Sequence, residues 1–207
     1  MRIIVFGPTG GTGHELVSQA LDAGHEVTAF ARDPAAVGAR QGLTVVKGNP
    51  LDAATVERAI ANHDAVLSAL GGRPWRSVPI CSGAMRNITA AMTHHKVRRI
   101  VAISTFGAAE TRAHVGWVAR HLLFGLVLRG EVADKEAMEK ELAATDLEWV
   151  VVRVGLLNSG PPRHEWRAAD DRSIQGMGKI ARADVAAFML AQLRCDDWLG
   201  RRPVVMY

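Results

Sequence analysis

Glycines recur at every third position near the start of the chain, in the run Gly7-Pro8-Thr9-Gly10-Gly11-Thr12-Gly13. The run directly follows the apolar residues 2–6 and precedes a stretch with helical periodicity. Between a strand and a helix, glycines let the backbone turn sharply and approach a pyrophosphate closely, while free N–H groups and the helix dipole stabilise its negative charge. We therefore predict a dinucleotide-binding loop. The alternative is a tight turn that only connects the two elements.

The second apolar run ends in Phe30-Ala31-Arg32-Asp33. NAD-binding proteins commonly place an acid here, where it accepts hydrogen bonds from the ribose 2′-hydroxyl. Arg32 instead can donate paired charge-assisted hydrogen bonds to a 2′-phosphate. Asp33 comes one position later, where it begins a turn with Pro34. We predict that the cofactor is NADP(H) rather than NAD(H). Two alternatives stay open: Asp33 swings toward the ribose, or Arg32 is an ordinary solvated arginine.

Apolar runs rich in valine and isoleucine alternate with segments of helical length. The runs are 2–6, 27–31, 43–47, 65–70, 99–103 and 149–154, with a short strand at 203–205, and the expected helices are 12–23, 53–61, 78–94, 133–145 and 183–193. Continuous apolar runs indicate strands that are covered on both faces. The predicted fold is α/β: a single-domain, Rossmann-like, doubly wound parallel sheet with helices on both faces.

Two connections, 106–130 and 158–178, are longer than this repeat requires. Both follow strands at their carboxyl ends, which is the edge where ligands bind in open α/β sheets. We expect one NAD(P)-binding domain over residues 1–207, in which these two insertions face the substrate.

The composition suits a cytoplasmic protein with one core. The chain has 207 residues, 48% hydrophobic and 22% charged, and a net charge of +4. Its basic residues are scattered, without a stripe interleaved with aromatics, so we expect no nucleic-acid binding. No apolar run approaches the ~20 residues that span a bilayer, the first residues leave no room for a secretory signal, and two cysteines fit a reducing compartment. We expect no membrane contact.

Four segments together resemble one family. They are Phe6-Gly7-Pro8-Thr9-Gly10-Gly11-Thr12-Gly13, Glu26-Val27-Thr28-Ala29-Phe30-Ala31-Arg32-Asp33, Arg86-Asn87-Ile88-Thr89-Ala90-Ala91-Met92 and Ala183-Asp184-Val185-Ala186-Ala187-Phe188-Met189-Leu190. On these segments the chain resembles atypical short-chain dehydrogenases/reductases of the NmrA-like group, particularly the biliverdin-IXβ reductase/flavin reductase type. The likeness covers nearly the whole chain. Because many relatives share the first two segments, it identifies the group better than the substrate.

The resemblance implies a set of cofactor contacts. They are phosphate contacts from Gly7, Thr9, Gly10, Gly11, Thr12 and Gly13, an adenine contact from Asn49, contacts beside the ribose and adenosine from Leu70, Gly71 and Arg73, and contacts over the nicotinamide carboxamide from Val154, Gly155 and Leu156. Asn49 replaces the usual aspartate and fits an Asn-Pro turn nearly as well. Leu156 stands where the biliverdin reductases carry a histidine, which argues against biliverdin as the substrate.

The resemblance also places the hydroxyls of Ser104 and Thr105 beside the nicotinamide. Carbonyl-reducing members of the superfamily use Tyr-x-x-x-Lys, because the alkoxide formed in the reaction needs a proton donor. The one tyrosine here is Tyr207, outside any such motif, whereas Lys135 stands at the place of the motif's lysine, four residues after Glu131. Lys135 is either a ribose or phosphate ligand or a surface lysine in a charged run.

Without that tyrosine, the acceptors favoured are conjugated ones, such as flavins and quinones, which stabilise negative charge until a proton follows from water. We predict an NADPH-dependent reductase of a conjugated acceptor, with Ser104 or Thr105 orienting the reacting group and catalysis consisting mainly of alignment. The alternative is a non-catalytic NADP(H)-binding redox sensor with a regulatory protein partner. The missing tyrosine also argues against an epimerase of nucleotide sugars.

No metal site is expected from the histidines. His114 and His121 are two helical turns apart, about 10 Å along the axis, which is too far for both to bind one ion. His94 and His95 are adjacent and should point in different directions. The apolar residues around Trp117 indicate a packed or partner-facing helix, which leaves a homo-oligomer open.

Overall fold

The computed structural model describes residues 1–71, 79–108, 129–169 and 178–207. Its strands are β1 (Arg2–Phe6), β2 (Glu26–Ala31), β3 (Leu43–Lys47), β4 (Ala65–Ser68), β5 (Arg99–Thr105), β6 (Glu148–Val154), β7 (Leu156–Asn158), β8 (Arg167–Ala169), β9 (Lys179–Ala181) and β10 (Val204–Met206). The helices are α1 (Gly11–Asp22), α2 (Ala53–Ile60), α3 (Ile80–His94), α4 (Arg129–Ala143) and α5 (Arg182–Ala191), with a short 3-10 helix η1 (Pro34–Ala36).

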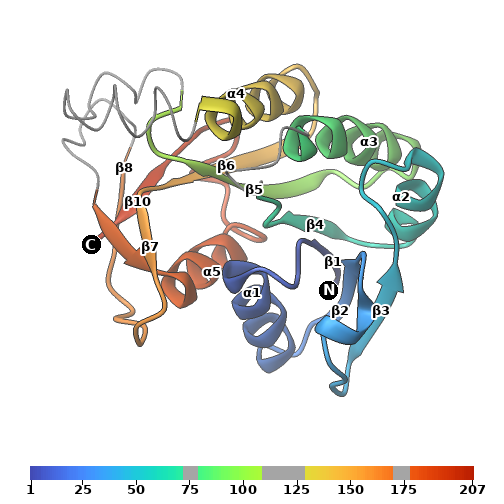
Figure 1. Cartoon of the computed structure of the whole chain (residues 1–207), viewed down its shortest axis with the longest axis horizontal. Helices are drawn as coiled ribbons and strands as arrows, with labels where there is room; N and C mark the ends of the chain where they lie inside the picture. The colour runs from blue at the N-terminus through green and yellow to red at the C-terminus, as the bar shows by residue number, and fades with distance from the viewer. Residues whose placement is uncertain (72–78, 109–128, 170–177) are drawn as a thin grey trace.

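The main sheet has the strand order β3-β2-β1-β4-β5-β6-β10-β8. All its neighbouring strands pair in parallel except β10 and β8, which are antiparallel. The order reverses between β1 and β4, so the chain switches direction across the sheet at that point (Figure 1). This is a Rossmann-like α/β fold, as predicted, and ligands in such folds bind beside the switch at the carboxyl ends of the strands.

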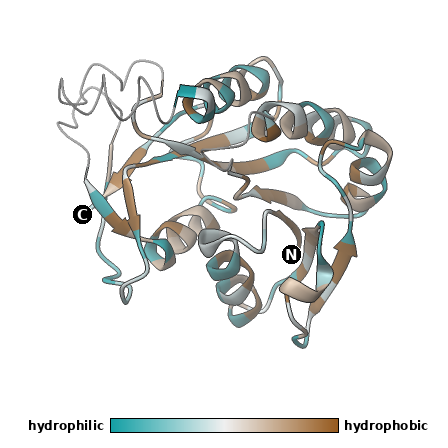
Figure 2. Ribbon diagram, viewed as in Figure 1, coloured by the Kyte–Doolittle hydropathy of each residue, from teal (hydrophilic) through white to brown (hydrophobic). Residues whose placement is uncertain are grey.

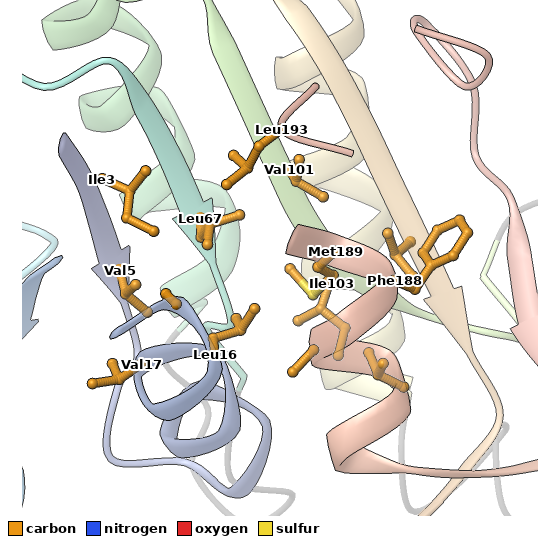
Figure 3. Packing of buried hydrophobic residues seen from close by; sticks show 14 of the residues in the cluster. Ile3, Val5, Leu16, Val17, Leu67, Val101, Ile103, Phe188, Met189 and Leu193 are labelled. Carbon is orange, nitrogen blue, oxygen red and sulfur yellow. The ribbon is translucent and has the colours of Figure 1, made fainter. Parts of the chain in front are cut away.

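Side chains alternate along each strand and build a core on both faces of the sheet. Ile3 and Val5 of β1 pack with Leu16 of α1, in a cluster completed by α5 (Figure 3). Ile4 and Phe6 point to the other face, in a cluster built with α2, α3 and α4. Figure 2 shows hydrophobic strands at the centre and mixed polarity on the helices around them. Burial on both faces explains the continuous apolar runs.

The structure differs most from the predicted elements in the two long connections. The helix predicted at 133–145 begins at Arg129 and ends at Ala143, so the last residues of the first long connection belong to α4. The second connection contributes β8, and β7 pairs with β9 in a separate two-stranded sheet. These three-residue strands carry too few side chains to show a periodicity. Residues 109–128, most of the first predicted insertion, and residues 170–177, a part of the second, lie outside the described residues.

Candidate cofactor and acceptor site

The glycine loop joins β1 to α1 and packs against the end of β4. Gly7 has a φ of +79°, which favours glycine, and a Cβ atom there would lie 2.7 Å from the carbonyl oxygen of Ala69. A Cβ atom at Gly13 would overlap the carbonyl oxygen of Gly7. The loop's own packing therefore requires glycine at both positions. Thr9 is exposed beside them.

The outer side of the loop offers free donors. In the described part of the chain, the N–H groups of Gly11, Thr12 and Gly13 donate to no acceptor. Gly10 is extended, with φ −78° and ψ 158°, and a Cβ atom there would meet only the Gly7 carbonyl oxygen, at 3.6 Å. The fold thus leaves room above Gly10, and the unpartnered N–H groups fit a diphosphate at the positive end of α1.

Arg32 and Asp33 follow β2 at the same edge of the sheet. The Arg32 side chain is exposed, and no hydrogen bond or ion pair joins it to the described residues. Oδ1 of Asp33 accepts a hydrogen bond from the N–H of Ala35 at 3.2 Å and caps η1. Asp33 therefore begins the expected turn, and of these two side chains Arg32 is the one left free for a ligand.

Asn49 forms the Asn-Pro turn that was its alternative interpretation. Its Oδ1 accepts a hydrogen bond from the N–H of Leu51 at 3.2 Å. The neighbouring Asn87 donates from Nδ2 to the carbonyl oxygen of Pro50 at 3.0 Å and so holds the same turn from α3. Within the described residues the amide nitrogen of Asn49 has no hydrogen-bond partner, so it is the part of this side chain left free for an adenine.

Of the two interpretations of Lys135, as a ribose or phosphate ligand or as a surface lysine, the structure tests only the second. The surface interpretation is wrong, because the side chain is 4% exposed. Its Nζ donates to the carbonyl oxygens of Leu70 at 2.6 Å and Ile103 at 2.8 Å. Lys135 thereby joins the ends of β4 and β5, which leaves Gly71 exposed just beyond Leu70. Arg73 lies outside the described residues.

Acidic side chains of α4 surround this lysine. Burial raises the pKa of the Glu131 carboxyl, although the Lys135 ammonium opposes the shift. Asp134 accepts hydrogen bonds from the N–H groups of Cys81 at 2.8 Å and Ser82 at 2.9 Å, and from the Ser82 hydroxyl at 2.6 Å. Burial by itself raises the pKa of Asp134, but these hydrogen bonds outweigh burial and lower it. Asp134 thus caps the N-terminus of α3.

Ser104 is engaged in a network that sequence analysis missed. The side chain is 2% exposed, and its hydroxyl donates to Oε1 of Glu139 at 2.6 Å. Glu139 also accepts from Arg153, at 3.2 Å from Nε and 2.6 Å from Nη2, and pairs with Arg202 at 3.3 Å. An arginine inside an apolar strand was the available signal, because a buried charge needs a partner.

Thr105 lies on the opposite side of β5 from Ser104, since side chains alternate along a strand. It pairs with Val154 across the sheet and is half-buried, and its hydroxyl donates to the carbonyl oxygen of Phe106 at 3.1 Å. Gly155 and Leu156 follow directly, and the Leu156 side chain is 43% exposed. The structure therefore brings Thr105 together with the segment expected over the nicotinamide.

Tyr207 belongs to a separate network around Asp184. Its hydroxyl donates to Oδ2 of Asp184 at 2.6 Å and accepts from the N–H of Ala181 at 3.0 Å. Asp184 also accepts from the N–H groups of Arg163 at 2.9 Å and His164 at 3.0 Å. Burial by itself raises the pKa of Asp184, but these hydrogen bonds outweigh it and lower the pKa. The network anchors the described start of the second insertion to α5.

The expectation that His94 and His95 point apart is wrong. Their ring centroids are 4.8 Å apart with an interplanar angle of 30°, and Nδ1 of His94 lies 2.7 Å from Oε1 of Glu57. The three side chains place ligand-type atoms within 4.8 Å of one another. The short His94–Glu57 distance is that of a direct hydrogen bond, whereas tetrahedral zinc ligands lie about 3.3 Å apart. His114 and His121 lie outside the described residues.

Known proteins resemble the chain along most of its length. A family model described as NAD(P)H-binding matches residues 7–196. Photosystem II assembly factor Ycf39 of Synechocystis sp. is 27% identical over 210 residues, which cover 95% of this chain and 60% of that protein. The chain thus spans less than two thirds of the length of Ycf39. Reductase pytE of Aspergillus terreus is 26% identical over 202 residues, 76% of each protein.

Solved structures share the fold. ChuY, an anaerobilin reductase from Escherichia coli O157:H7, superposes with a TM-score of 0.84 at 22% identity, over 100% of this chain and 97% of that chain. A short-chain dehydrogenase/reductase from Veillonella parvula in complex with NADP has a TM-score of 0.81 at 16% identity, over 100% and 94%. The NAD(P)H-binding family match agrees with the resemblance stated from the sequence, and these structures show the shared fold. No helix in the described residues is long and apolar enough to cross a membrane.

Proposed function

The chain belongs to the NAD(P)H-binding family, and from that premise we propose that it is an NADPH-dependent reductase of a conjugated acceptor such as a flavin or a quinone. One observation carries the choice of acceptor: in the part of the chain that the structure describes, no tyrosine hydroxyl is paired with a lysine amine beside the strand ends. The hydroxyl of Tyr207, the one tyrosine, donates to Asp184 at 2.6 Å, and Nζ of Lys135 is held by two backbone carbonyls. A simple carbonyl would lack its usual proton donor.

The preference for NADPH rests on the end of β2. A 2′-phosphate would find the unpartnered guanidinium of Arg32, whereas a free ribose 2′-hydroxyl would need an acceptor. The carboxylate that follows Arg32 in the chain, on Asp33, already accepts the N–H of Ala35 at 3.2 Å. The bound nicotinamide would supply the hydride, and the chain's residues would hold it against the acceptor.

Of the two hydroxyls expected near the nicotinamide, Thr105 is the better candidate to orient the acceptor. The Ser104 proton already lies between Ser104 and Glu139, at a 2.6 Å separation, and that side chain is buried. Thr105 is half-buried beside Val154 and can exchange its local backbone hydrogen bond for one to a ligand. Catalysis would then consist of alignment, which suits an acceptor that takes its proton from water.

The test is NADPH oxidation with a panel of flavins, quinones, aldehydes and ketones. We expect turnover of flavin or quinone, and Thr105→Ala should lower kcat more than it weakens NADPH binding. Thr93→Ala is the matched control, because Thr93 is an exposed threonine whose hydroxyl donates only to the Thr89 carbonyl oxygen. Efficient ketone reduction without flavin or quinone turnover would refute the proposed acceptor class.

A non-catalytic NADP(H)-binding sensor is the second candidate. The observation that favours it is the 27% identity to a protein described as an assembly factor. A sensor would act through a regulatory protein partner or a second copy of the chain. Tight NADPH binding with no turnover of any acceptor in the panel would favour this function over the reductase.

A further inference from the structure

Arg182 lies directly on the glycine loop, although it is 171 positions further along the chain than Gly11. A Cβ atom at Gly11 would lie 2.5 Å from Cδ and 2.7 Å from Nε of Arg182. The stem of the arginine therefore occupies the space that a larger residue at position 11 would fill. Its Nη1 donates to the hydroxyl of Ser159 at 2.9 Å. The guanidinium is thus held between the glycine loop and the second insertion.

The packing of α1 against α5 determines this placement. Leu16 and Val17 of α1 share a buried cluster with Met189 of α5, and the helices lie side by side (Figure 3). Nε2 of Gln19 donates to the carbonyl oxygen of Ala183 at 2.9 Å. Arg182 and Gly11 are each the first residue of their helix, so the contact brings the two N-termini together.

The charge of Arg182 has no counterion in the described residues. Among these residues its hydrogen-bond partner is the neutral hydroxyl of Ser159, and the side chain is only half-buried. The oxygens of the nearby Asp184 already accept from two backbone N–H groups and the Tyr207 hydroxyl. A cation is also disfavoured at the N-terminus of a helix, because the dipole is positive there. An anion at this point would satisfy both helix ends and the guanidinium.

We propose that Arg182 binds the diphosphate bridge of the cofactor, on the side of the glycine loop next to α5. The N–H groups of Gly11, Thr12 and Gly13 are free on the same loop, and a guanidinium forms charge-assisted forks with phosphate oxygens. Ser159 orients the guanidinium, so the diphosphate site and the second insertion share one residue. This inference rests on NAD(P)H binding by the family and is independent of the acceptor proposed above.

The experiment is a calorimetric titration of wild-type protein and Arg182→Met with NADPH and with adenosine 2′-monophosphate, which has no diphosphate. Methionine keeps the packing of the stem on Gly11 and removes the charge. We expect NADPH to bind about tenfold or more weakly, because charge-assisted hydrogen bonds are lost, with unchanged binding of adenosine 2′-monophosphate. Arg32→Ala should weaken both ligands. Arg40→Met is the control, since Arg40 pairs with Asp22 at 2.7 Å, away from the loop.

A second pair of variants tests the contact itself. Gly11→Ala places a Cβ atom on Arg182 and should weaken NADPH binding by displacing it, whereas the same change in an Arg182→Ala protein should cost much less. Wild-type NADPH affinity in folded Arg182→Met, or equal losses from Gly11→Ala in both backgrounds, would overturn the inference. A wild-type protein that binds no NADPH would overturn the cofactor assignment itself.

Discussion

Replacing Lys135 by methionine should destabilise the protein, whether or not the residue also contacts the cofactor. The ammonium is 4% exposed and donates to the carbonyl oxygens of Leu70 at 2.6 Å and Ile103 at 2.8 Å. Methionine fills a similar volume but donates nothing. It leaves two carbonyl groups at the ends of β4 and β5 without their charged donor, and the carboxylates of Glu131 and Asp134 without a neighbouring cation.

Each hydrogen bond from a charged group contributes about 1.5–3 kcal/mol, whereas loss of a buried charge returns part of its desolvation cost. We therefore expect the free energy of unfolding to fall by about 3 kcal/mol. For a domain of this size, that corresponds to a Tm lower by roughly 6–12 °C. The effect should fall on the strand ends, since both acceptors lie there.

The assay is urea and thermal unfolding of Lys135→Met beside Lys140→Met. Lys140 is exposed on the same helix, so its replacement should change the free energy of unfolding by no more than about 0.5 kcal/mol. If Lys135→Met is as stable as the wild type, the argument from the two carbonyl contacts is wrong. If Lys135→Met loses turnover but keeps wild-type stability, the result would support a contact between Lys135 and the cofactor.

Four further substitutions test other parts of the structure. Arg32→Ala should lower the affinity for NADPH about tenfold, toward that for NADH, because the 2′-phosphate loses its charge-assisted hydrogen bonds to the guanidinium. Titrations with both cofactors measure this, and equal affinities of the wild type for NADPH and NADH would contradict the assignment. Gly10→Val should fold but lose NADPH binding, whereas Gly13→Val should fail to fold, as circular dichroism would show, because its side chain overlaps the carbonyl oxygen of Gly7. Asp184→Asn should lower the free energy of unfolding at pH 7 by about 1–3 kcal/mol. Folding lowers the pKa of Asp184, so the ionised carboxylate stabilises the protein fully above the unfolded-state pKa of about 3.9, and this stabilisation is lost as the pH falls through the folded-state pKa. The free energies of unfolding of the variant and the wild type should therefore converge in acid.

Local patterns in the sequence were sufficient for the fold and for the glycine turn between β1 and α1. The strands at 2–6 and 43–47 agree with the prediction residue for residue. Residues 3–6 of β1 are buried on both faces of the sheet, which explains their unbroken apolar run, whereas β3 is a half-buried edge strand. The glycine spacing records a turn whose constraints are nearly all local, as the contact between Gly13 and Gly7 shows. Asp33 could likewise be placed in a turn from the proline beside it.

The tertiary structure alone decided which polar groups meet. Lys135 looked like part of a charged surface run, and its burial depends on carbonyl groups 65 and 32 positions away. The pairing of Glu139 with Arg153 and the contact of Arg182 with Gly11 also join different elements. Such pairs leave no periodic pattern in the sequence, because the spacing of charged residues along a helix is the same whether its face meets solvent or packs on the sheet. Only the packing of α4 and α5 onto the sheet distinguishes the two environments.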